Sequence, residues 1–245
     1  MPFSRVALLY GPAALDRLAA AHVCIAGLGA VGATIAESLA RTGVGRFTLI
    51  DFDEIRPSNL NRHPFAFRST LRQPKTAAAA RFLADINPAA RIEPVSAFLD
   101  ASTIPPLLAA NPGAVWVDAI DALGPKVELL ARAHAARPPY LISCLGAARR
   151  DDPASFAVAD LFQTAGCPLA RHVRKWLRRR GVTSGIPCVY STSLPLPPPP
   201  GAPPADEPDF LVRGRHRPPM GSLHAATAAA ALLAVREILR HLLAP

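Results

Sequence analysis

The spacing G-x-G-x-x-G occurs near the start of the chain, in Gly27-Leu28-Gly29-Ala30-Val31-Gly32. In such a turn the first glycine permits a tight bend, the second lets a phosphate approach the backbone, and the third lets helix and strand pack closely. The helix that follows offers free N–H groups and a partial positive charge to the anion. Asp51 lies nineteen residues after Gly32, about where a carboxylate can accept hydrogen bonds from ribose hydroxyls. The pattern predicts a nucleotide site without specifying the nucleotide.

The residues after Asp51 narrow the chemistry. Asn59 and Arg62 lie three residues apart, so they share one face of a helical turn. Hydride transfer needs no cations aimed at phosphates, whereas adenylation builds negative charge on the α-phosphate and the leaving pyrophosphate, which Arg, Lys and Mg²⁺ stabilise. Arg62 and Lys75 are candidates for that role, and Asp121 is available to hold the metal. Taken singly, Arg62 also fits a solvated surface arginine and Lys75 a lysine at a helix start.

The elements that must position these residues alternate in type. A short apolar run that ends at a glycine is typical of a buried parallel strand, and strand, glycine turn, helix and strand form a βαβ unit. The alternation predicts a Rossmann-like, doubly wound α/β fold: a mainly parallel sheet with helices on both faces. We expect strands at 22–26, 47–50, 91–95, 114–117 and 140–143, and helices at 13–21, 31–42, 75–86, 102–110 and 125–136.

Length and composition are those of a folded domain. With 245 residues, 50% of them hydrophobic and 18% charged, the chain is not of the disordered class and can bury a core without a disulfide or metal. We expect a single adenylation domain over 1–245, with a nucleotide-binding half at 1–150 and a substrate and dimer half at 151–245. The net charge of +9 suits a polyanionic partner but does not require one.

Other sequence features bear on the compartment. No C-x-x-C pair is present, so neither a structural zinc site nor a disulfide framework is expected. The cysteines are Cys24, Cys144, Cys167 and Cys188. The first ten residues lack a continuous apolar run, so no signal peptide is predicted. The apolar stretch Leu223–Val235 is too short to span a bilayer and predicts a buried C-terminal helix. We expect a cytoplasmic protein without a membrane partner.

Beyond residue 150 the alternation weakens. A helical stretch at 171–180 is strongly basic, which would suit RNA phosphates, although a solvated helix face explains it equally well. Its basic residues are Arg171, Arg174, Lys175, Arg178, Arg179 and Arg180. Residues 195–208 contain eight prolines, which cannot donate to a strand ladder, so we expect an exposed loop over 195–219.

Taken in order, the motifs of residues 3–146 resemble those of the ThiF-type adenylating superfamily, whose members resemble the ubiquitin-activating enzymes. The matching residues are Arg5, Gly27/Gly29/Gly32, Asp51/Asp53, Ser58-Asn59-Leu60-Asn61-Arg62, Gln73-Pro74-Lys75 and Asp118/Asp121. The resemblance implies ATP and Mg²⁺ as cofactors. It implies that Asp51 binds ribose, that Asp53 belongs to the same nucleotide-binding motif, and that Asn59, Arg62 and Lys75 contact the phosphates.

The resemblance also implies a metal ligand and a second subunit. Asp121 would ligate Mg²⁺, and Arg5 would reach the site of the other subunit in a homodimer. Two positions depart from the family pattern: His63 stands where the family usually has Gln, and Ala122 where it often has Asn. Neither departure removes a charge that adenylation needs, so the predicted activity is unaffected.

Two branches of the superfamily, which act on different substrates, are candidates for this chain. Enzymes that adenylate the C-terminal glycine of a ubiquitin-like sulfur carrier typically carry two C-x-x-C pairs, which this chain lacks. The tRNA threonylcarbamoyladenosine dehydratases activate a threonyl carboxylate on tRNA and close it into a ring. Stretches resembling that branch are 117–121, 125–126, 160–161, 168–170, 188–192 and 221–222. We predict the second activity, with tRNA as partner. The alternatives are carrier activation, which would add sulfur-relay partners, and a nucleotide-binding scaffold without catalysis.

Cys188 and His63 have alternative interpretations. In thioester-forming relatives a cysteine receives the acyl group, but cyclisation would use the substrate's own carbamoyl nitrogen, so Cys188 is not required. His63 could approach the phosphates, although a hydrogen-bonding structural histidine is the favoured interpretation.

Overall fold

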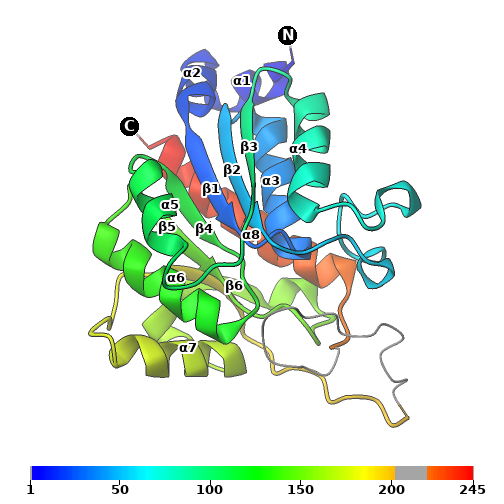
Figure 1. The fold of residues 1–245 in the computed structure, drawn as a ribbon, viewed down its shortest axis with the longest axis vertical. Helices are drawn as coiled ribbons and strands as arrows, with labels where there is room; N and C mark the ends of the chain where they lie inside the picture. The colour runs from blue at the N-terminus through cyan, green and yellow to red at the C-terminus, as the bar shows by residue number, and fades with distance from the viewer. Residues whose placement is uncertain (1, 202–219, 245) are drawn as a thin grey trace.

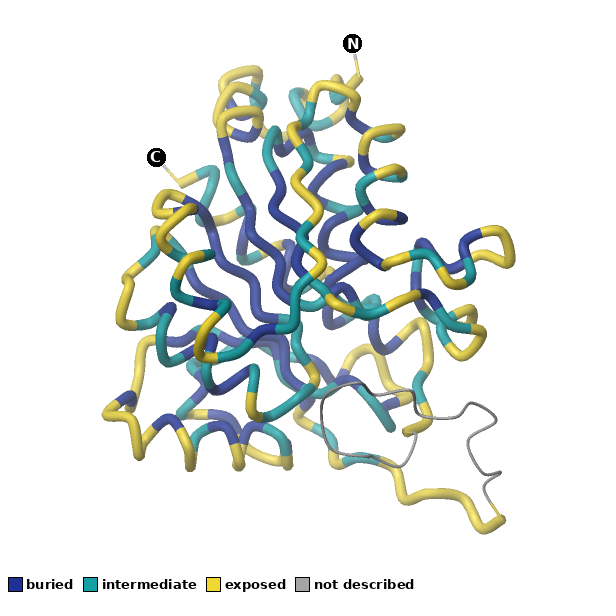
Figure 2. The backbone as a smooth tube through the Cα atoms, in the orientation of Figure 1, coloured by how far each residue is buried: buried dark blue, intermediate teal, exposed yellow. Residues whose placement is uncertain are grey.

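The computed structural model describes residues 2–201 and 220–244. At its centre is a seven-stranded sheet with the order β3-β2-β1-β4-β5-β7-β6, in which β6 alone runs antiparallel to its neighbour. The strands are β1 His22–Ala26, β2 Arg46–Asp51, β3 Arg91–Ser96, β4 Val115–Asp118, β5 Leu141–Cys144, β6 Phe156–Asp160 and β7 Pro187–Ser191. The inner strands are buried, and β3 is a largely exposed edge strand (Figures 1 and 2).

Helices cover both faces of the sheet (Figure 1). One face packs against α3, α4 and α8, and the other against α5, α6 and α7, while α1 and α2 lie at the amino ends of β1 and β2. The helices are α1 Ser4–Tyr10, α2 Pro12–Ala20, α3 Ala30–Thr42, α4 Lys75–Ile86, α5 Ile104–Ala110, α6 Leu123–Ala136, α7 Pro168–Arg178 and α8 His224–Leu242. Short 3₁₀ turns are η1 Pro57–Asn59, η2 Arg68–Thr70, η3 Pro153–Ser155 and η4 Leu161–Gln163.

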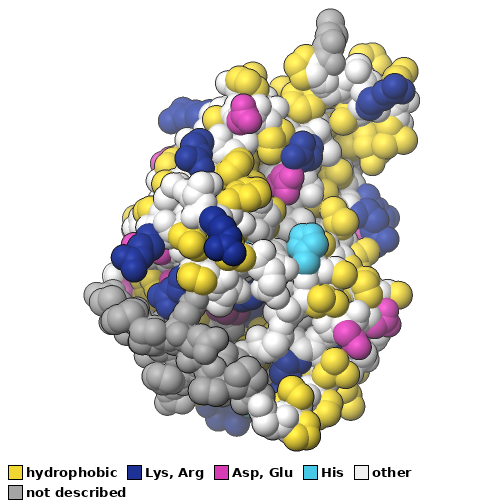
Figure 3. Space-filling view, turned by 90° about the vertical axis from the view of Figure 1, so that its right-hand side faces the viewer, with side chains coloured by type: hydrophobic (Ala, Val, Ile, Leu, Met, Phe, Trp, Pro, Cys, Tyr) yellow, Lys and Arg dark blue, Asp and Glu magenta, His cyan; other side chains and the backbone are white. Residues whose placement is uncertain are grey.

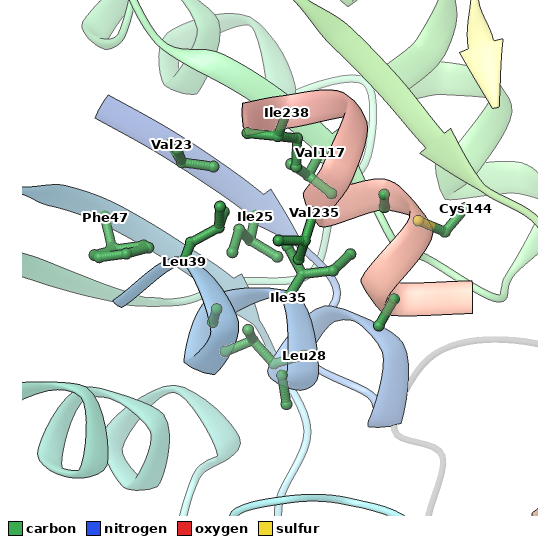
Figure 4. Packing of buried hydrophobic residues seen from close by; sticks show 14 of the residues in the cluster. Val23, Ile25, Leu28, Ile35, Leu39, Phe47, Val117, Cys144, Val235 and Ile238 are labelled. Atoms are coloured by element: carbon green, nitrogen blue, oxygen red, sulfur yellow. The ribbon is translucent and has the colours of Figure 1, made fainter. Parts of the chain in front are cut away.

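Strand β1 shows why the sheet needs both helical layers. Its side chains alternate between the faces, so Val23 and Ile25 enter one core while Cys24 and Ala26 enter the other. In the first core β1 packs against α3 and α8 (Figure 4). A strand buried on both faces is largely apolar, as β1 is from Val23 to Ala26.

The direction in which the chain winds reverses at β1. From β1 the chain winds outward through β2 to β3, then returns to form β4 on the other side of β1. In open α/β sheets, ligands bind outside the carboxyl ends of the strands at such a reversal point. The glycine turn follows β1 directly, and Asp51 and Asp118 are the last residues of β2 and β4.

The fold class and most predicted elements are confirmed. Helix α4 has the predicted bounds, and α8 packs on the sheet as the C-terminal helix. Helix α1 and strands β6 and β7 were not predicted. The proline-rich stretch 195–219 lies outside the described residues from position 202 onward. None of the helices within the described ranges is long and apolar enough to cross a lipid bilayer.

Candidate adenylation site

The glycines of the turn after β1 have three different environments. Gly27 has φ +90°, and a Cβ there would lie 2.8 Å from the Ala119 carbonyl oxygen. A Cβ on Gly32 would lie 1.9 Å from the Gly27 carbonyl oxygen. A Cβ on Gly29 would meet no atom within 4 Å. Gly27 and Gly32 are therefore required by packing, whereas Gly29 leaves an open approach to the backbone, as phosphate binding needs.

Asp51 fixes the turn from the end of β2. Its Oδ2 accepts a hydrogen bond from the Leu28 N–H at 2.6 Å, and its Oδ1 accepts one from the Asp53 N–H at 2.8 Å. The carboxylate is only partly buried and has lone pairs to spare. It can hold the turn and accept ribose hydroxyls at the same time.

His63 also holds the glycine turn, through a hydrogen bond to the Leu28 backbone. Its Nδ1 accepts a hydrogen bond from the Phe65 N–H at 3.1 Å, so the Nε2 carries the proton and donates to the Leu28 carbonyl at 2.8 Å. The ring is buried, and burial lowers the pKa of His63 to about 4, which keeps it neutral. Asp51 and His63 thus hold the two polar groups of the Leu28 backbone. This contact agrees with the structural interpretation of His63.

Lys75 is buried and already paired. Its Nζ lies 2.8 Å from Asp53 Oδ2, and its backbone N–H donates to the Asp53 carbonyl at 2.9 Å. Arg56 approaches the other oxygen of Asp53 at 3.7 Å. The ion pair with Asp53 therefore holds the Lys75 ammonium close to the end of β2. An incoming phosphate would compete with Asp53 for Nζ.

The segment that carries Asn59 and Arg62 is folded back on itself. The Arg62 Nη1 donates to the Ser58 carbonyl at 2.7 Å and to Asn61 Oδ1 at 3.0 Å. Asn59 Oδ1 accepts from the Arg56 N–H at 3.1 Å. Because these contacts lie within one short stretch, the guanidinium is held locally and stays partly exposed.

Contacts from a distant part of the chain anchor the same segment. The Asn61 Nδ2 donates to the Ser222 carbonyl at 2.9 Å, and His224 Nδ1 donates to the Arg62 carbonyl at 3.1 Å. The start of α8 thereby sets the position of the Arg62 backbone.

The two aspartates after β4 have different roles. Asp118 is fully buried and contacts Lys126 Nζ at 2.5 Å and Ser143 Oγ at 2.6 Å. Burial raises the pKa of Asp118, and the Lys126 ammonium opposes that rise. Asp121 is exposed in the loop that leads into α6. The buried pair joins β4, β5 and α6, so of these two aspartates only Asp121 is exposed to solvent.

The donor set around Asp121 fits Mg²⁺ bound mainly through substrate phosphates. Within residues 2–201 and 220–244, no group of three or more His, Cys, Asp or Glu could together hold a metal. Mg²⁺ is usually held by one or two carboxylates together with phosphates and waters. A single exposed carboxylate is compatible with that arrangement.

Arg5 lies at the opposite end of the sheet from the glycine turn. The Phe3 ring packs against Gly43, and Gly45 bonds to the end of α2, which places α1 beyond the amino end of β2. The six residues of β2 separate that end from Asp51 by about 17 Å. Arg5 therefore does not join the site of its own chain.

Comparison with known proteins agrees with this geometry. The family model described as the ThiF family matches residues 3–245. The chain belongs to the ThiF family. It is 36% identical to the tRNA threonylcarbamoyladenosine dehydratase of Escherichia coli over 78% of this chain and 73% of that protein. It is 36% identical to the Bacillus subtilis protein of the same name over 79% and 76%.

Solved structures extend the similarity to the fold of this ThiF-family chain. The E. coli tRNA N6-threonylcarbamoyladenosine dehydratase TcdA in complex with ATP superposes with a TM-score of 0.87 at 32% identity. The match covers 99% of this chain and 94% of that one. The same enzyme in complex with AMP gives a TM-score of 0.86.

The fold brings most of the residues of the family motifs to the carboxyl ends of the central strands. Gly27, Gly29 and Gly32 follow β1, Asp51 ends β2 and Asp53 follows it, Lys75 contacts Asp53, and Asp121 follows β4. Asn59 and Arg62 lie on the connection between Asp53 and Lys75. Arg5 and the basic helix lie elsewhere.

The basic residues of α7 are not equivalent. Arg174 donates to the Thr164 hydroxyl, and Arg180 forms an ion pair with Glu128 at 2.6 Å. Arg178 lies over the Phe162 ring, and Arg179 over the Trp176 ring. Arg171 and Lys175 are exposed and make no ion pair within the part of the chain that the structure describes. These last two are the most accessible to a polyanion.

Cys188 is excluded as an acyl acceptor by its surroundings. It has no exposed surface in β7, and burial raises the pKa of its thiol, which suppresses the reactive thiolate. All four cysteines are free and buried.

Sequence reasoning assigned no role to Lys126, Ser143, Asn61 or His224. Lys126 falls in a stretch that resembles the dehydratases, and Asn61 lies inside the S-N-L-N-R motif. Their partners in these contacts are 8 to 162 residues away in the chain, so the contacts follow only from the fold.

Proposed function

We propose that this chain is an ATP-dependent adenylating enzyme that cyclises N6-threonylcarbamoyladenosine in tRNA and releases AMP and pyrophosphate. The observation that carries the proposal is the similarity, over 99% of the chain, to TcdA solved with ATP. The open approach at Gly29 supports it independently. A tRNA substrate also favours the cytoplasm as the working compartment.

In the first step the acyl carboxylate attacks the α-phosphorus of ATP, and pyrophosphate leaves. The amides of the glycine turn would receive the phosphates, and Asp51 the ribose hydroxyls. Lys75 and Arg62 would exchange their present partners for phosphoryl oxygens and neutralise the growing charge. Asn59 would contribute from the same connection.

In the second step the carbamoyl nitrogen of the substrate attacks the activated carbonyl carbon, and AMP leaves. The ring closes within the substrate, so no covalent enzyme intermediate is needed. The burial of Cys188 is compatible with this route.

Mg²⁺ would be held by Asp121 together with the ATP phosphates. When bound it would supply positive charge to the leaving pyrophosphate. Asp118 would act indirectly, by keeping Lys126 and the ends of β4 and β5 in place.

We further propose a homodimer in which Arg5 enters the partner's site. Support comes from the exposure of Leu8 (79%) and Leu9 (72%) on α1 beside Arg5. Figure 3 shows hydrophobic side chains exposed at the upper end of one face of the molecule. Inactive Arg5→Ala mixed with inactive Asp121→Ala should regain partial activity, because one site of the mixed dimer carries neither change. No recovery despite demonstrated subunit exchange would remove Arg5 from the site.

ATP–pyrophosphate exchange tests the main proposal. Exchange should depend on tRNA that carries threonylcarbamoyladenosine and should be absent with unmodified tRNA. Exchange that instead requires a ubiquitin-like carrier protein would assign the chain to the carrier-activating branch. ATP binding without pyrophosphate exchange under either condition would identify the chain as a nucleotide-binding scaffold without catalysis.

A further inference from the structure

Arg150 is a buried cation for which the described residues supply no ion-pair partner. It lies six residues beyond the end of β5 and is 4% exposed. Its Nε and Nη1 are shielded from solvent and have no hydrogen-bond partner within residues 2–201 and 220–244. No ion pair involving Arg150 occurs among the described residues either. Nearly all buried polar groups in folded proteins are hydrogen-bonded, so a guanidinium in this state requires an explanation.

The conformation of Arg150 is set by its neighbour. Arg149 has a left-handed φ of +57°. Its N–H donates to the Gly221 carbonyl at 2.8 Å, its carbonyl accepts from the Leu196 N–H at 2.8 Å, and its side chain bonds back to Leu196. Three contacts of Arg149 thus fix the backbone turn from which the buried Arg150 side chain extends.

The adjacent carboxylates do not compensate the charge. Asp152 is exposed and caps η3 by accepting from the Ala154 N–H at 2.8 Å, and Asp151 is exposed. Burial lowers the pKa of Arg150; Cys167 opposes that change, and nearby Arg149 adds to it. Within the described chain the guanidinium is therefore destabilised where it lies, and an anion from outside would relieve that cost.

We propose that Arg150 binds the carboxylate of the acyl substrate, the group that becomes adenylated. The planar guanidinium can donate two parallel hydrogen bonds to a carboxylate, and an oxygen lone pair remains for attack on phosphorus. The loop that carries Arg150 starts at the carboxyl end of β5, which lies beside β4. The glycine turn and Asp121 follow the carboxyl ends of β1 and β4, at the same end of the sheet. This inference rests on the proposed function and adds a substrate-binding residue to it.

The test compares binding and stability of Arg150→Met with those of the wild type. Affinity for tRNA carrying threonylcarbamoyladenosine should fall by about 10- to 100-fold, as expected for lost charge-assisted hydrogen bonds. Affinity for unmodified tRNA, which lacks the carboxylate, and for ATP should not change. Without substrate the variant should unfold at the same temperature as the wild type or higher, because an unpaired buried charge is gone. Lys126→Met is the matched control: it removes a paired buried cation and should lower the unfolding temperature.

Each other outcome overturns the inference in a distinct way. Equal losses for modified and unmodified tRNA would mean that Arg150 contacts an RNA phosphate. A lowered unfolding temperature in Arg150→Met would make Arg150 a structural residue, and unchanged affinity would show that it does not touch the substrate. If the wild type itself fails to exchange pyrophosphate in the presence of modified tRNA, the proposed function fails and this assignment fails with it.

Discussion

Replacing Gly29 by alanine should separate nucleotide binding from folding. The backbone there is extended, with φ −69° and ψ −169°, and the added Cβ would meet no atom within 4 Å. The folded state accommodates the methyl group, and the unfolded chain loses freedom. The free energy of unfolding should therefore stay the same or rise by about 0.4–1 kcal/mol.

The same methyl group stands where a phosphate would reach the backbone. Losing two charge-assisted hydrogen bonds to the turn would cost about 3 kcal/mol or more, which is roughly a 100-fold weaker affinity for ATP. At an ATP concentration of about 100 times the wild-type dissociation constant, the wild type gains about 2.7 kcal/mol of stability and the variant about 0.4 kcal/mol. For a chain of this size, those gains correspond to a rise in melting temperature of roughly 5–11 °C and about 1–2 °C.

Thermal denaturation with and without Mg-ATP measures both effects. Gly32→Ala is the matched control, because its Cβ would lie 1.9 Å from the Gly27 carbonyl oxygen and should lower the melting temperature even without ATP. A wild-type ATP shift in Gly29→Ala would refute the assignment of this turn to the phosphates. So would a shift with NAD and none with Mg-ATP in the wild type.

Further changes test the buried charges and the basic helix. Lys126→Met should cost about 3–5 kcal/mol in urea denaturation, since Asp118 stays buried without its partner. Removing the ammonium raises the pKa of Asp118 further above its unfolded value, so this loss should shrink as the pH falls; a pH-independent loss would count against the pairing. Burial holds the pKa of His63 at about 4, so its stabilising contribution is complete above pH 6.5 and is lost as the pH falls toward 4. The stability difference between wild type and His63→Gln should shrink by up to about 3 kcal/mol over that range, and a constant difference would contradict this. Arg171→Gln with Lys175→Gln should weaken tRNA binding and reduce its log–log salt slope by up to ~0.7–0.9 per lost contact, with ATP binding unchanged. An unaltered slope would assign this face of α7 to solvent.

The first half of the fold could be predicted because its pattern is local. The buried strand β1, the glycine turn and helix α3 each leave a periodic signal, and α4 was predicted with its observed bounds. Strands β6 and β7 leave a weaker one: β7 begins at Pro187, and β6 joins it antiparallel outside the βαβ repeat. Helix α1 has only seven residues and buries none of them, so it lacks a continuous apolar face.

The candidate site was predictable in residue types but not in contacts. Motif order identified Asp51, Lys75 and Arg62, while their present partners depend on how loops from different strands meet. Lys126 contacts Asp118 only because β4, β5 and α6 converge. No spacing rule indicates that Arg150 is buried without a partner among the described residues, since this depends on where the fold places hydrogen-bond acceptors.

Strand β3 has a consequence for how the protein behaves at high concentration. As an edge strand it presents backbone groups that a strand from another molecule could pair with, which is a common start of aggregation. Pro94, aligned with Leu49 of β2, offers no N–H to such a strand, and Arg91 and Glu93 place charges along the same edge. The sheet is thus closed to extension on this side by residue choice rather than by a covering element, which favours solubility during synthesis and folding.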